Sequence, residues 1–297
     1  MKKCLVIGAV FADTVLNVDH VPISGEDVVV TGSSVCAGGC AYNVACVLKE
    51  FDIPATLFAP IGKGIYADFL RQEIKKRGIE AVCHDKDYDN GNSICMIDKN
   101  AERTFINIMG VDSHYKSEWF DILNMSEYDT IYFPGYEMEG DNYSVIYPFI
   151  QKHKDVCRLY FAPGPACFRI PKPYMQQLLA LSPVLHLNAS EAIYISGETS
   201  YRDAADTLFR LTGSPVIITI GKEGCLVKTK SDSRIIEAEA VRAIDTNGAG
   251  DSHIGTVIAT RKLNHDIFNA ARVANHVASQ VIQVNAPNLP PHALSMR

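Results

Sequence analysis

Short runs of β-branched and other apolar residues alternate with amphipathic segments along most of the chain, and this alternation limits the possible folds more than any other feature. A parallel strand pair needs a long crossover, which is usually a helix, so the pattern predicts a mainly parallel sheet covered by helices. The expected strands and helices are, in chain order, 4–10, 41–51, 55–61, 66–78, 129–135, 142–152, 158–164, 183–188, 201–213 and 215–221. Apolar residues at helical spacing predict a last helix that contains Ala270, Val273, Ala274, Val277, Ala278 and Val281.

Two kinds of segment depart from this rhythm. Residues 225–230 and 234–241 are apolar runs without an intervening helix, so the main sheet is predicted to end in antiparallel strands. Residues 14–36 and 92–109 alternate apolar and polar side chains with a period of two, which is typical of half-buried strands. They predict a small β-sheet that projects from the body, so 1–297 is interpreted as one domain with two inserted lid segments.

Composition excludes several classes of protein. The chain of 297 residues is 47% hydrophobic and has a net charge of −6, without a basic run, so a nucleic-acid partner is not expected. No apolar run reaches the roughly 18 residues that cross a bilayer, so no membrane association is expected. The nine cysteines form no CxxC pair, and Asp13 interrupts the apolar opening segment before any signal-cleavage pattern. These features predict a cytoplasmic protein with reduced thiols.

The stretch "RAIDTNGAGDSHIG", residues 242–255, places a glycine-rich loop directly before a helix. The unpaired N–H groups and the dipole of a helix N-terminus bind anions, and Gly248 and Gly250 let the backbone approach a phosphate closely. Asp251 would repel an anion unless it had a role of its own, and accepting the proton of a hydroxyl that attacks a nucleotide's γ-phosphoryl group is such a role. The alternative is an ordinary turn at Asn247 followed by a helix-capping acid.

Four motifs in a fixed order resemble the signatures of one family. They are "GGCAYNVA" at 38–45, "NASE" at 188–191, "TIGKEG" at 219–224 and "DTNGAGD" at 245–251. Together they are similar to the motifs of the ribokinase family of sugar and nucleoside kinases, also called the PfkB family. The resemblance implies an α/β fold, a ribokinase-like three-layer α/β/α architecture with a mainly parallel central sheet and a small β-sheet lid. It also implies ATP-dependent phosphorylation of a hydroxyl group, primary by expectation, on a small sugar or a nucleoside.

The resemblance assigns roles on both sides of the expected site. The anion hole and catalytic base match Gly248, Ala249, Gly250 and Asp251, and the positions that contact substrate match Asp13, Gly39 and Asn43. A carboxylate accepts two hydroxyl protons and an amide both donates and accepts, so these side chains suit a polyol.

The nucleotide side of the resemblance rests on two further motifs. Asn188 and Glu191 match positions that hold the Mg²⁺ and phosphate network, the acid through metal-bound water, and Thr219, Gly221 and Gly224 match a loop that approaches ATP closely. Each motif alone has a structural alternative: a helix N-cap followed by a solvated acid for the first, and a turn between strands for the second.

The lid and the loop before the anion hole carry two additional hypotheses. Related enzymes often bind a monovalent cation beside the anion hole, so Asp245 and Asn247 are candidate K⁺ ligands. Arg103 stands on a lid segment from which it could touch the substrate, although an exposed strand charge is the more frequent outcome. Unpaired strands at the lid edges favour pairing between two chains, which predicts a homodimer.

Some positions depart from the family pattern and leave the acceptor open. His253 stands where the family commonly has an aromatic residue, and Ala162 stands where an aspartate is frequent. The segment "IGKGIYADF" at 61–69 lacks the family's usual acid and second glycine. None of these positions belongs to the predicted phosphoryl-transfer machinery, so they bear on which sugar or nucleoside is recognised.

Two rival interpretations remain at this stage. Gly62, Gly64 and Ala67 form G-x-G-x-x-A between a strand and a helix, with Asp85 at the end of the next strand, which indicates an NAD-dependent oxidoreductase. That pattern explains one segment of the chain and leaves the other motifs without a role. The second rival is a ligand-binding homologue that has kept the fold and lost catalysis, and the presence of Asp251 argues against it.

Overall fold

Two β-sheets make up the strand structure of residues 1–100 and 102–283, which are the residues that the computed structural model describes. The larger sheet has nine strands in the order β13-β12-β11-β10-β9-β8-β1-β4-β5. These strands are β1 Lys3–Ile7, β4 Ala55–Ile61, β5 Glu80–His84, β8 Tyr128–Pro134, β9 Arg158–Ala162, β10 Val184–Asn188, β11 Val216–Thr219, β12 Cys225–Lys228 and β13 Ser233–Ile236. The neighbours in the part β11-β10-β9-β8-β1-β4-β5 pair in parallel, whereas β12 pairs antiparallel with both β11 and β13, so both predictions for this sheet are confirmed.

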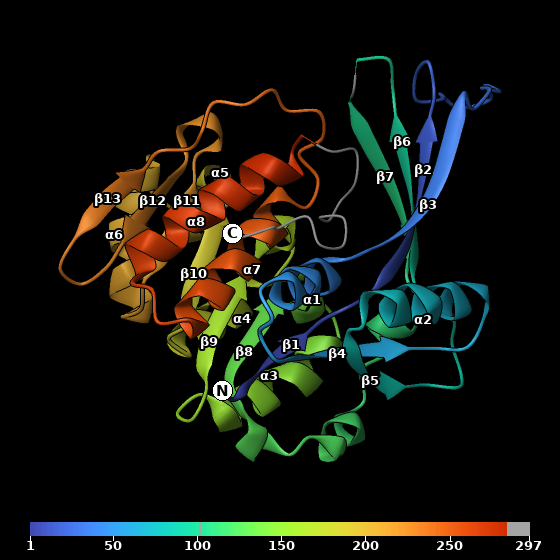
Figure 1. Ribbon diagram of the computed structural model, residues 1–297. Coiled ribbons are helices and arrows are strands. Elements are labelled where there is room, and N and C mark those ends of the chain that lie inside the picture. The colour runs from blue at the N-terminus through green and yellow to red at the C-terminus, as the bar shows by residue number, and fades with distance from the viewer. Residues whose placement is uncertain (101, 284–297) are drawn as a thin grey trace.

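Eight α-helices of the described residues cover the two faces of this sheet (Figure 1). They are α1 Cys40–Glu50, α2 Ile65–Arg77, α3 Asn142–His153, α4 Lys172–Ala180, α5 Ala189–Ser196, α6 Tyr201–Thr212, α7 Ala249–Lys262 and α8 Ile267–Val281. Helices α1, α2, α7 and α8 share one hydrophobic cluster, whereas α3 to α6 share the other. The side chains of β1 alternate between the two clusters, as the period of two in a strand requires. The result is the predicted three-layer architecture.

The smaller sheet is the lid. Its strands β2 Phe11–Asn17, β3 Gly32–Gly38, β6 Asn92–Ile97 and β7 Arg103–Ile108 lie in the order β3-β2-β6-β7 and project from the main body (Figure 1). The segments 14–36 and 92–109 contain parts of these four strands, with β2 beginning at Phe11 and β3 ending at Gly38, and residues 18–31 connect β2 to β3 without strand structure. Because β2 follows β1 directly and β3 leads into α1, the lid joins the body at the carboxyl end of β1.

Helix α7 lies in the interior of the molecule. Its residues 252–260 are all buried, between α1, α8 and the sheet. Gly255 permits the approach of α1, because a Cβ atom at Gly255 would lie 2.9 Å from Cβ of Val47. A helix buried on all sides is fixed in position, so its first turn is a rigid support for functional groups.

Two smaller findings complete the architecture. All nine cysteines lie within the described residues and are free thiols, as the sequence predicts. No helix in residues 1–100 or 102–283 combines the length and apolar character that a membrane span requires.

Candidate active site

The sequence-predicted site residues lie where strands of the main sheet end at their carboxyl edge. Asn188 ends β10 and Thr219 ends β11, and these two residues are register partners in the sheet. Asp13 lies in β2, just past the end of β1, and Asp251 lies in the first turn of α7. Ligands of open parallel α/β sheets bind outside the carboxyl ends of the strands, so the fold places these residues on its binding edge.

Helix α7 begins with its N–H groups free of side-chain caps. Gly248 is the N-cap residue with φ 73°, a left-handed conformation that favours glycine, and it has no side chain to cap the helix. A Cβ atom built on Gly250 meets none of the atoms of the described residues within 4 Å, so this position faces open space. An uncapped helix N-terminus beside open space has the geometry that an anion requires.

Asp251 and Asn43 are in contact, although 208 residues separate them in the sequence. The Asn43 amide nitrogen donates a hydrogen bond of 2.8 Å to Oδ2 of Asp251. Asn43 is buried in the first turn of α1, and the packing of α1 on α7 brings the two side chains together. A predicted substrate residue and the predicted base therefore share one site.

The surroundings of Asp251 favour its protonated form. Burial raises the pKa of its carboxyl group, and hydrogen bonds from the Asn43 amide and the Cys40 thiol lower it in part. Cys40 begins α1, and burial, followed by the charges of Asp251, Glu137 and Asp13, raises the pKa of the Cys40 thiol.

Asp13 is held by the lid. Ser93 in β6 donates a hydrogen bond of 2.6 Å to Oδ1 of Asp13, and the two residues are register partners. Gly38 leaves room for this carboxylate, since a Cβ atom there would lie 1.9 Å from Oδ2. Burial raises the pKa of Asp13, and the Ser93 hydrogen bond lowers it in part. The carboxylate is thus already engaged with a hydroxyl group.

Gly39 has a structural reason to be glycine. It is the N-cap residue of α1 with φ 102°, and a Cβ atom there would lie 2.7 Å from the carbonyl oxygen of Ala9. No side chain caps α1. A side chain at this position would separate α1 from the end of β1, so this glycine permits the close approach of the two elements.

Asn188 and Glu191 form a capping box at the start of α5. The Asn188 side chain accepts from the Glu191 N–H, and the Glu191 carboxylate accepts from the backbone N–H and the amide of Asn188. The structural alternative for this motif is therefore present, but the acid is buried rather than solvated, with 5% of Glu191 exposed. Burial raises the pKa of Glu191, and the Asn188 N–H lowers it in part.

The loop from Thr219 to Gly224 connects β11 to β12. Gly224 has φ 101°, and a Cβ atom there would lie 2.0 Å from the carbonyl oxygen of Ile236, so β13 depends on this glycine. Gly221 has φ 62° and faces open space. The Thr219 hydroxyl donates to the carbonyl of Leu187. This geometry fits a turn between strands that also leaves exposed backbone at the binding edge.

Asp245 lies at the start of the loop that leads to α7, and it contacts the lid. Its Oδ2 lies 2.7 Å from a guanidinium nitrogen of Arg103 in β7, and its Oδ1 accepts a hydrogen bond of 2.7 Å from the Asn247 N–H. The Asp245 side chain is 4% exposed. The sequence placed Arg103 on the lid and Asp245 in the loop, but gave no signal that they meet.

Comparisons with known proteins decide the family. Residues 1–293 match the sequence pattern of the pfkB family carbohydrate kinases. The chain belongs to this family. It is 28% identical over 285 residues to the uncharacterized sugar kinase YegV of Escherichia coli, covering 95% of this chain and 88% of that protein. It is 26% identical over 295 residues to the ribokinase of Staphylococcus aureus, covering 95% and 94%.

Solved structures show the same fold. The ribokinase of Giardia lamblia superimposes with a TM-score of 0.84 at 23% identity, covering 98% of each chain. The nucleoside kinase of Methanocaldococcus jannaschii superimposes with a TM-score of 0.78 at 19% identity, covering 98% of this chain and 96% of that one. The family and the fold together make this protein a carbohydrate kinase of the pfkB family.

Membership of the pfkB family overturns the oxidoreductase interpretation, and the structure gives the physical reason. The loop with Gly62, Gly64 and Ala67 does precede a helix, but Asp89 fills its anion position. The Ala67 N–H at the start of α2 donates a hydrogen bond of 2.8 Å to Oδ1 of Asp89. A Cβ atom at Gly64 would lie 2.1 Å from Oδ2 of the same carboxylate. The helix start that a dinucleotide phosphate would need is occupied by the chain's own acid.

Glu137 is a buried acid near the predicted site, and the sequence analysis did not identify it. It lies in the 3₁₀ helix η4 Tyr136–Met138, directly after β8, and is 4% exposed. Its Oε1 accepts a hydrogen bond of 2.6 Å from the Ala9 N–H, while Oε2 is buried without a partner in the described residues. Burial raises the pKa of Glu137 to about 8. A buried acid after a strand gives no sequence pattern that separates it from a surface turn.

His253 joins the two halves of the predicted nucleotide side. Its Nδ1 lies 2.9 Å from Nε2 of His186, and its Nε2 lies 3.1 Å from Oδ1 of Asn275 in α8. His186 lies in β10, two residues before Asn188, and His253 lies two residues after Asp251. The departure from the family's aromatic residue therefore creates a buried polar connection between β10, α7 and α8.

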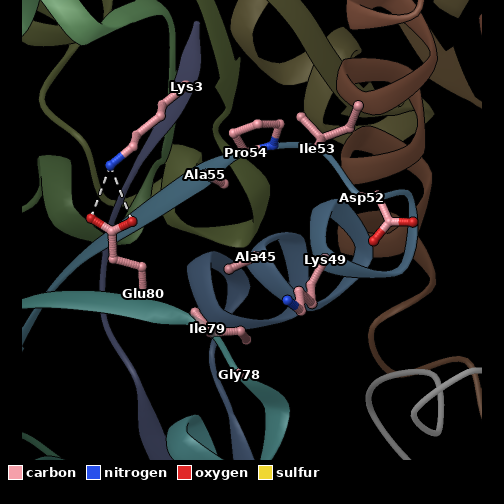
Figure 2. A pocket seen from close by; sticks show the side chains of 10 residues that line it. All are labelled: Lys3, Ala45, Lys49, Asp52, Ile53, Pro54, Ala55, Gly78, Ile79 and Glu80. Atoms are coloured by element: carbon pink, nitrogen blue, oxygen red, sulfur yellow. Dashed lines mark hydrogen bonds and ion pairs between the residues drawn. The ribbon is translucent and has the colours of Figure 1, made fainter. Parts of the chain in front are cut away.

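Two cavities bordered by described residues lie away from this site. One cavity of about 240 Å³ is bordered by Lys3, Ala55 and Glu80, the first residues of β1, β4 and β5, so it lies at the amino edge of the sheet (Figure 2). The Lys3–Glu80 ion pair lies at one side of it (Figure 2). A second cavity of about 470 Å³ lies beside Lys116 and Asn142. Neither contains a predicted site residue.

Proposed function

We propose that this protein transfers the γ-phosphoryl group of ATP to a primary hydroxyl group of a small sugar. The observation that carries the proposal is the 2.8 Å hydrogen bond between Asn43 and Asp251. It brings a side chain suited to hydroxyl groups next to a carboxylate in the first turn of an uncapped helix. Acceptor, base and anion site thereby come within the reach of one phosphoryl transfer.

The acceptor is oriented by groups from α1 and the lid. Asp13 accepts hydroxyl hydrogen bonds, as its contact with Ser93 illustrates, and Asn43 both donates and accepts. Gly39 leaves the start of α1 without a side chain at the edge of the site. These groups hold the reacting hydroxyl beside Asp251.

Asp251 draws off the hydroxyl proton as the oxygen attacks phosphorus. Its pKa is raised by burial, which brings the carboxylate closer to the pKa of an effective base near neutral pH. The backbone N–H groups at Gly248, Ala249 and Gly250 would donate to the charge that develops on the transferred group, with Ala249 giving up its 3.3 Å hydrogen bond to the Thr246 carbonyl oxygen. Donors fixed at a helix start need no rearrangement during the reaction.

The nucleotide binds over β10 and β11 in this proposal, with Asn188, Thr219, Gly221 and Gly224 next to it and Mg²⁺ on the phosphates. Among residues 1–100 and 102–283, no group of three or more His, Cys, Asp or Glu side chains could hold a metal ion. This fits Mg²⁺, which keeps several waters and takes its other ligands from substrate phosphates. Glu191 would hold it through water, and the metal would neutralise phosphate charge.

A nucleoside is the second candidate acceptor. It shares the hydroxyl groups that Asp13 and Asn43 suit, and a nucleoside kinase has the same fold. Curated relatives named as a sugar kinase and a ribokinase favour the sugar. The two candidates are separated by measuring ATP consumption with Mg²⁺ and pooled sugars or pooled nucleosides. Turnover with the sugar pool supports the proposal, and absence of turnover with either pool supports a non-catalytic homologue.

Replacing Asp251 by Asn tests the base directly. The amide keeps the size of the side chain and removes the proton acceptor, so kcat is expected to fall by about 10²- to 10⁴-fold. ATP affinity, measured by titration calorimetry, is expected to stay near that of the native protein because the backbone N–H groups are unchanged. A kcat close to the native value contradicts the base assignment.

We also propose a cytoplasmic homodimer. The free thiols and the absence of a membrane-spanning helix in the described residues support the location. The edge strands β3 and β7 of the lid carry exposed apolar side chains, which support pairing between two lids.

A further inference from the structure

An ion pair joins the lid to the loop that leads into α7. Arg103 is the first residue of β7, and its guanidinium nitrogen lies 2.7 Å from Oδ2 of Asp245. The side chains are 21% and 4% exposed, so water does little to screen the pair. Exposed pairs of the lid, such as Lys99 with Asp19, have side chains that are 64% and 68% exposed. Of these two ion pairs, Arg103–Asp245 is the one that contains a buried charge, the Asp245 carboxylate, which the guanidinium group compensates.

Both carboxylate oxygens of Asp245 already have a partner, and one of these partners is a cation. Oδ2 contacts Arg103, and Oδ1 accepts the Asn247 N–H at 2.7 Å. The resemblance to ribokinases assigns this acid to a monovalent cation. The contacts do not favour that role, because a cation bound to this carboxylate would lie close to the guanidinium group, which carries the same sign of charge.

The same lid sheet holds both sides of the site. Arg103 pairs with Ile97 at one end of β6, and Ser93 of β6 donates a hydrogen bond to Asp13. At the other side, the Asp245–Asn247 contact fixes the loop just before Gly248, where α7 begins. Placement of the lid therefore sets the acceptor-binding acid and the anion loop together.

We propose that Arg103 is a positioning residue whose guanidinium group supplies the positive charge that relatives take from a monovalent cation, so that lid placement rather than K⁺ orders the anion loop. This inference rests on the proposed phosphoryl transfer. It implies that the native protein works without K⁺, whereas a variant without the guanidinium group leaves the Asp245 carboxylate free for K⁺.

The test compares Arg103→Gln, Arg103→Lys and the native protein in KCl and in tetramethylammonium chloride at equal ionic strength. The native rate is expected to agree within about twofold in the two salts. Arg103→Gln is expected to lose about 10²-fold in kcat in tetramethylammonium chloride, since a displaced loop misaligns the reacting groups, and to recover part of it in KCl. Arg103→Lys keeps the charge and is expected to remain independent of K⁺.

Lys99→Gln is the matched control, because it removes one positive charge from the exposed tip of the same lid. It is expected to behave as the native protein does in both salts. Strong K⁺ activation of the native protein overturns the proposal, and so does an Arg103→Gln variant that equals the native protein in both salts.

A second measurement needs no turnover. The melting temperature of Arg103→Gln is expected to rise on exchange of tetramethylammonium for K⁺, whereas that of the native protein and of Lys99→Gln is not. If no acceptor supports turnover, the proposed function fails while this measurement still decides the ion-pair proposal. The ion-pair proposal is overturned if K⁺ raises the melting temperature of the native protein as much as that of Arg103→Gln. If Arg103→Gln does not fold, Arg103→Lys provides the comparison.

Discussion

Asp251 and Glu137 are carboxyl groups whose surroundings favour the protonated form. Burial is the main cause for both, and both charges act on the Cys40 thiol. They differ in their partners. Asp251 accepts a hydrogen bond from the side chain of Asn43, which a mutation can remove. Glu137 accepts a hydrogen bond from the backbone N–H of Ala9, which a substitution of Ala9 by a residue other than proline would keep. We therefore expect Asp251 to affect the pH dependence of catalysis and Glu137 to affect the pH dependence of stability.

Removing the Asn43 amide should move the pH profile of catalysis. The amide lowers the pKa of Asp251 by donating to its charged form, so Asn43→Leu raises that pKa further. The acidic limb of the kcat profile is expected to shift to higher pH, together with a lower maximal rate. Rates between pH 4 and 9 measure this shift. A limb at the native pH shows that another group titrates there.

Glu137 should make the native protein less stable as pH rises. Its pKa is raised from 4.5, the ordinary value of a glutamate, to about 8 in the folded state, so between these pH values the folded state binds more protons than the unfolded state. Stability from this group is present below pH 4.5 and is lost toward pH 8. Glu137→Gln keeps the acceptor for Ala9 and removes the titration. Urea unfolding from pH 5 to 8.5 measures the free energy of unfolding of both proteins. That of the variant is expected to increase relative to that of the native protein as the pH rises. A difference between the two that does not change with pH contradicts this prediction.

At the scale of elements, the His186–His253–Asn275 chain joins a strand to two helices with defined proton positions. The Asn275 amide nitrogen donates to the carbonyl oxygens of Ile236 and Glu237, so its oxygen faces His253. His253 must then donate from Nε2 and accept at Nδ1 from the Nε2–H of His186. Burial lowers the pKa of both histidines, that of His253 to about 4. The chain is therefore neutral at physiological pH.

Replacing His253 by Phe supplies the aromatic residue common in the family but breaks this chain. His186 and Asn275 each lose a hydrogen-bond partner in the interior, which lowers the free energy of unfolding by about 1–3 kcal/mol for each group. The variant is therefore expected to unfold at a lower urea concentration than the native protein. His276→Phe in the exposed part of α8 is the control and should change stability by less than about 0.5 kcal/mol. An equal effect of both substitutions contradicts a structural role for the chain.

The strand and helix pattern of this protein could be predicted because it depends on local spacing. Gly78, for example, ends α2 in a left-handed conformation with φ 61°, as its place after the amphipathic segment indicates. Helices α4 and α5 were not predicted, since they are only nine and eight residues long. The motifs located Asp251 and Asn43, but the contacts of Glu137, His253 and Arg103 join distant segments, and local spacing carries no information on such pairs.

At the scale of the whole molecule, the lid is the surface suited to a second copy of the chain. The outer strand β7 exposes Phe105, Ile106 and Ile108, and β3 at the other edge exposes Val35. Sedimentation equilibrium is expected to give twice the mass of the chain. Phe105→Lys should shift the equilibrium toward the monomer, since a charged residue on an edge strand opposes pairing. A native monomer at all concentrations contradicts the dimer.

The hydrogen bond between Asn43 and Asp251 also determines when the predicted site can form during protein synthesis. In the proposed function, the residues that orient the acceptor are synthesised first, yet the carboxylate of Asp251 lies 208 positions after Asn43. A nascent chain can therefore fold much of its sheet but lacks the proposed base until α7 has left the exit tunnel of the ribosome. Under this proposal, phosphoryl transfer begins only after Ala249–Lys262 have been synthesised.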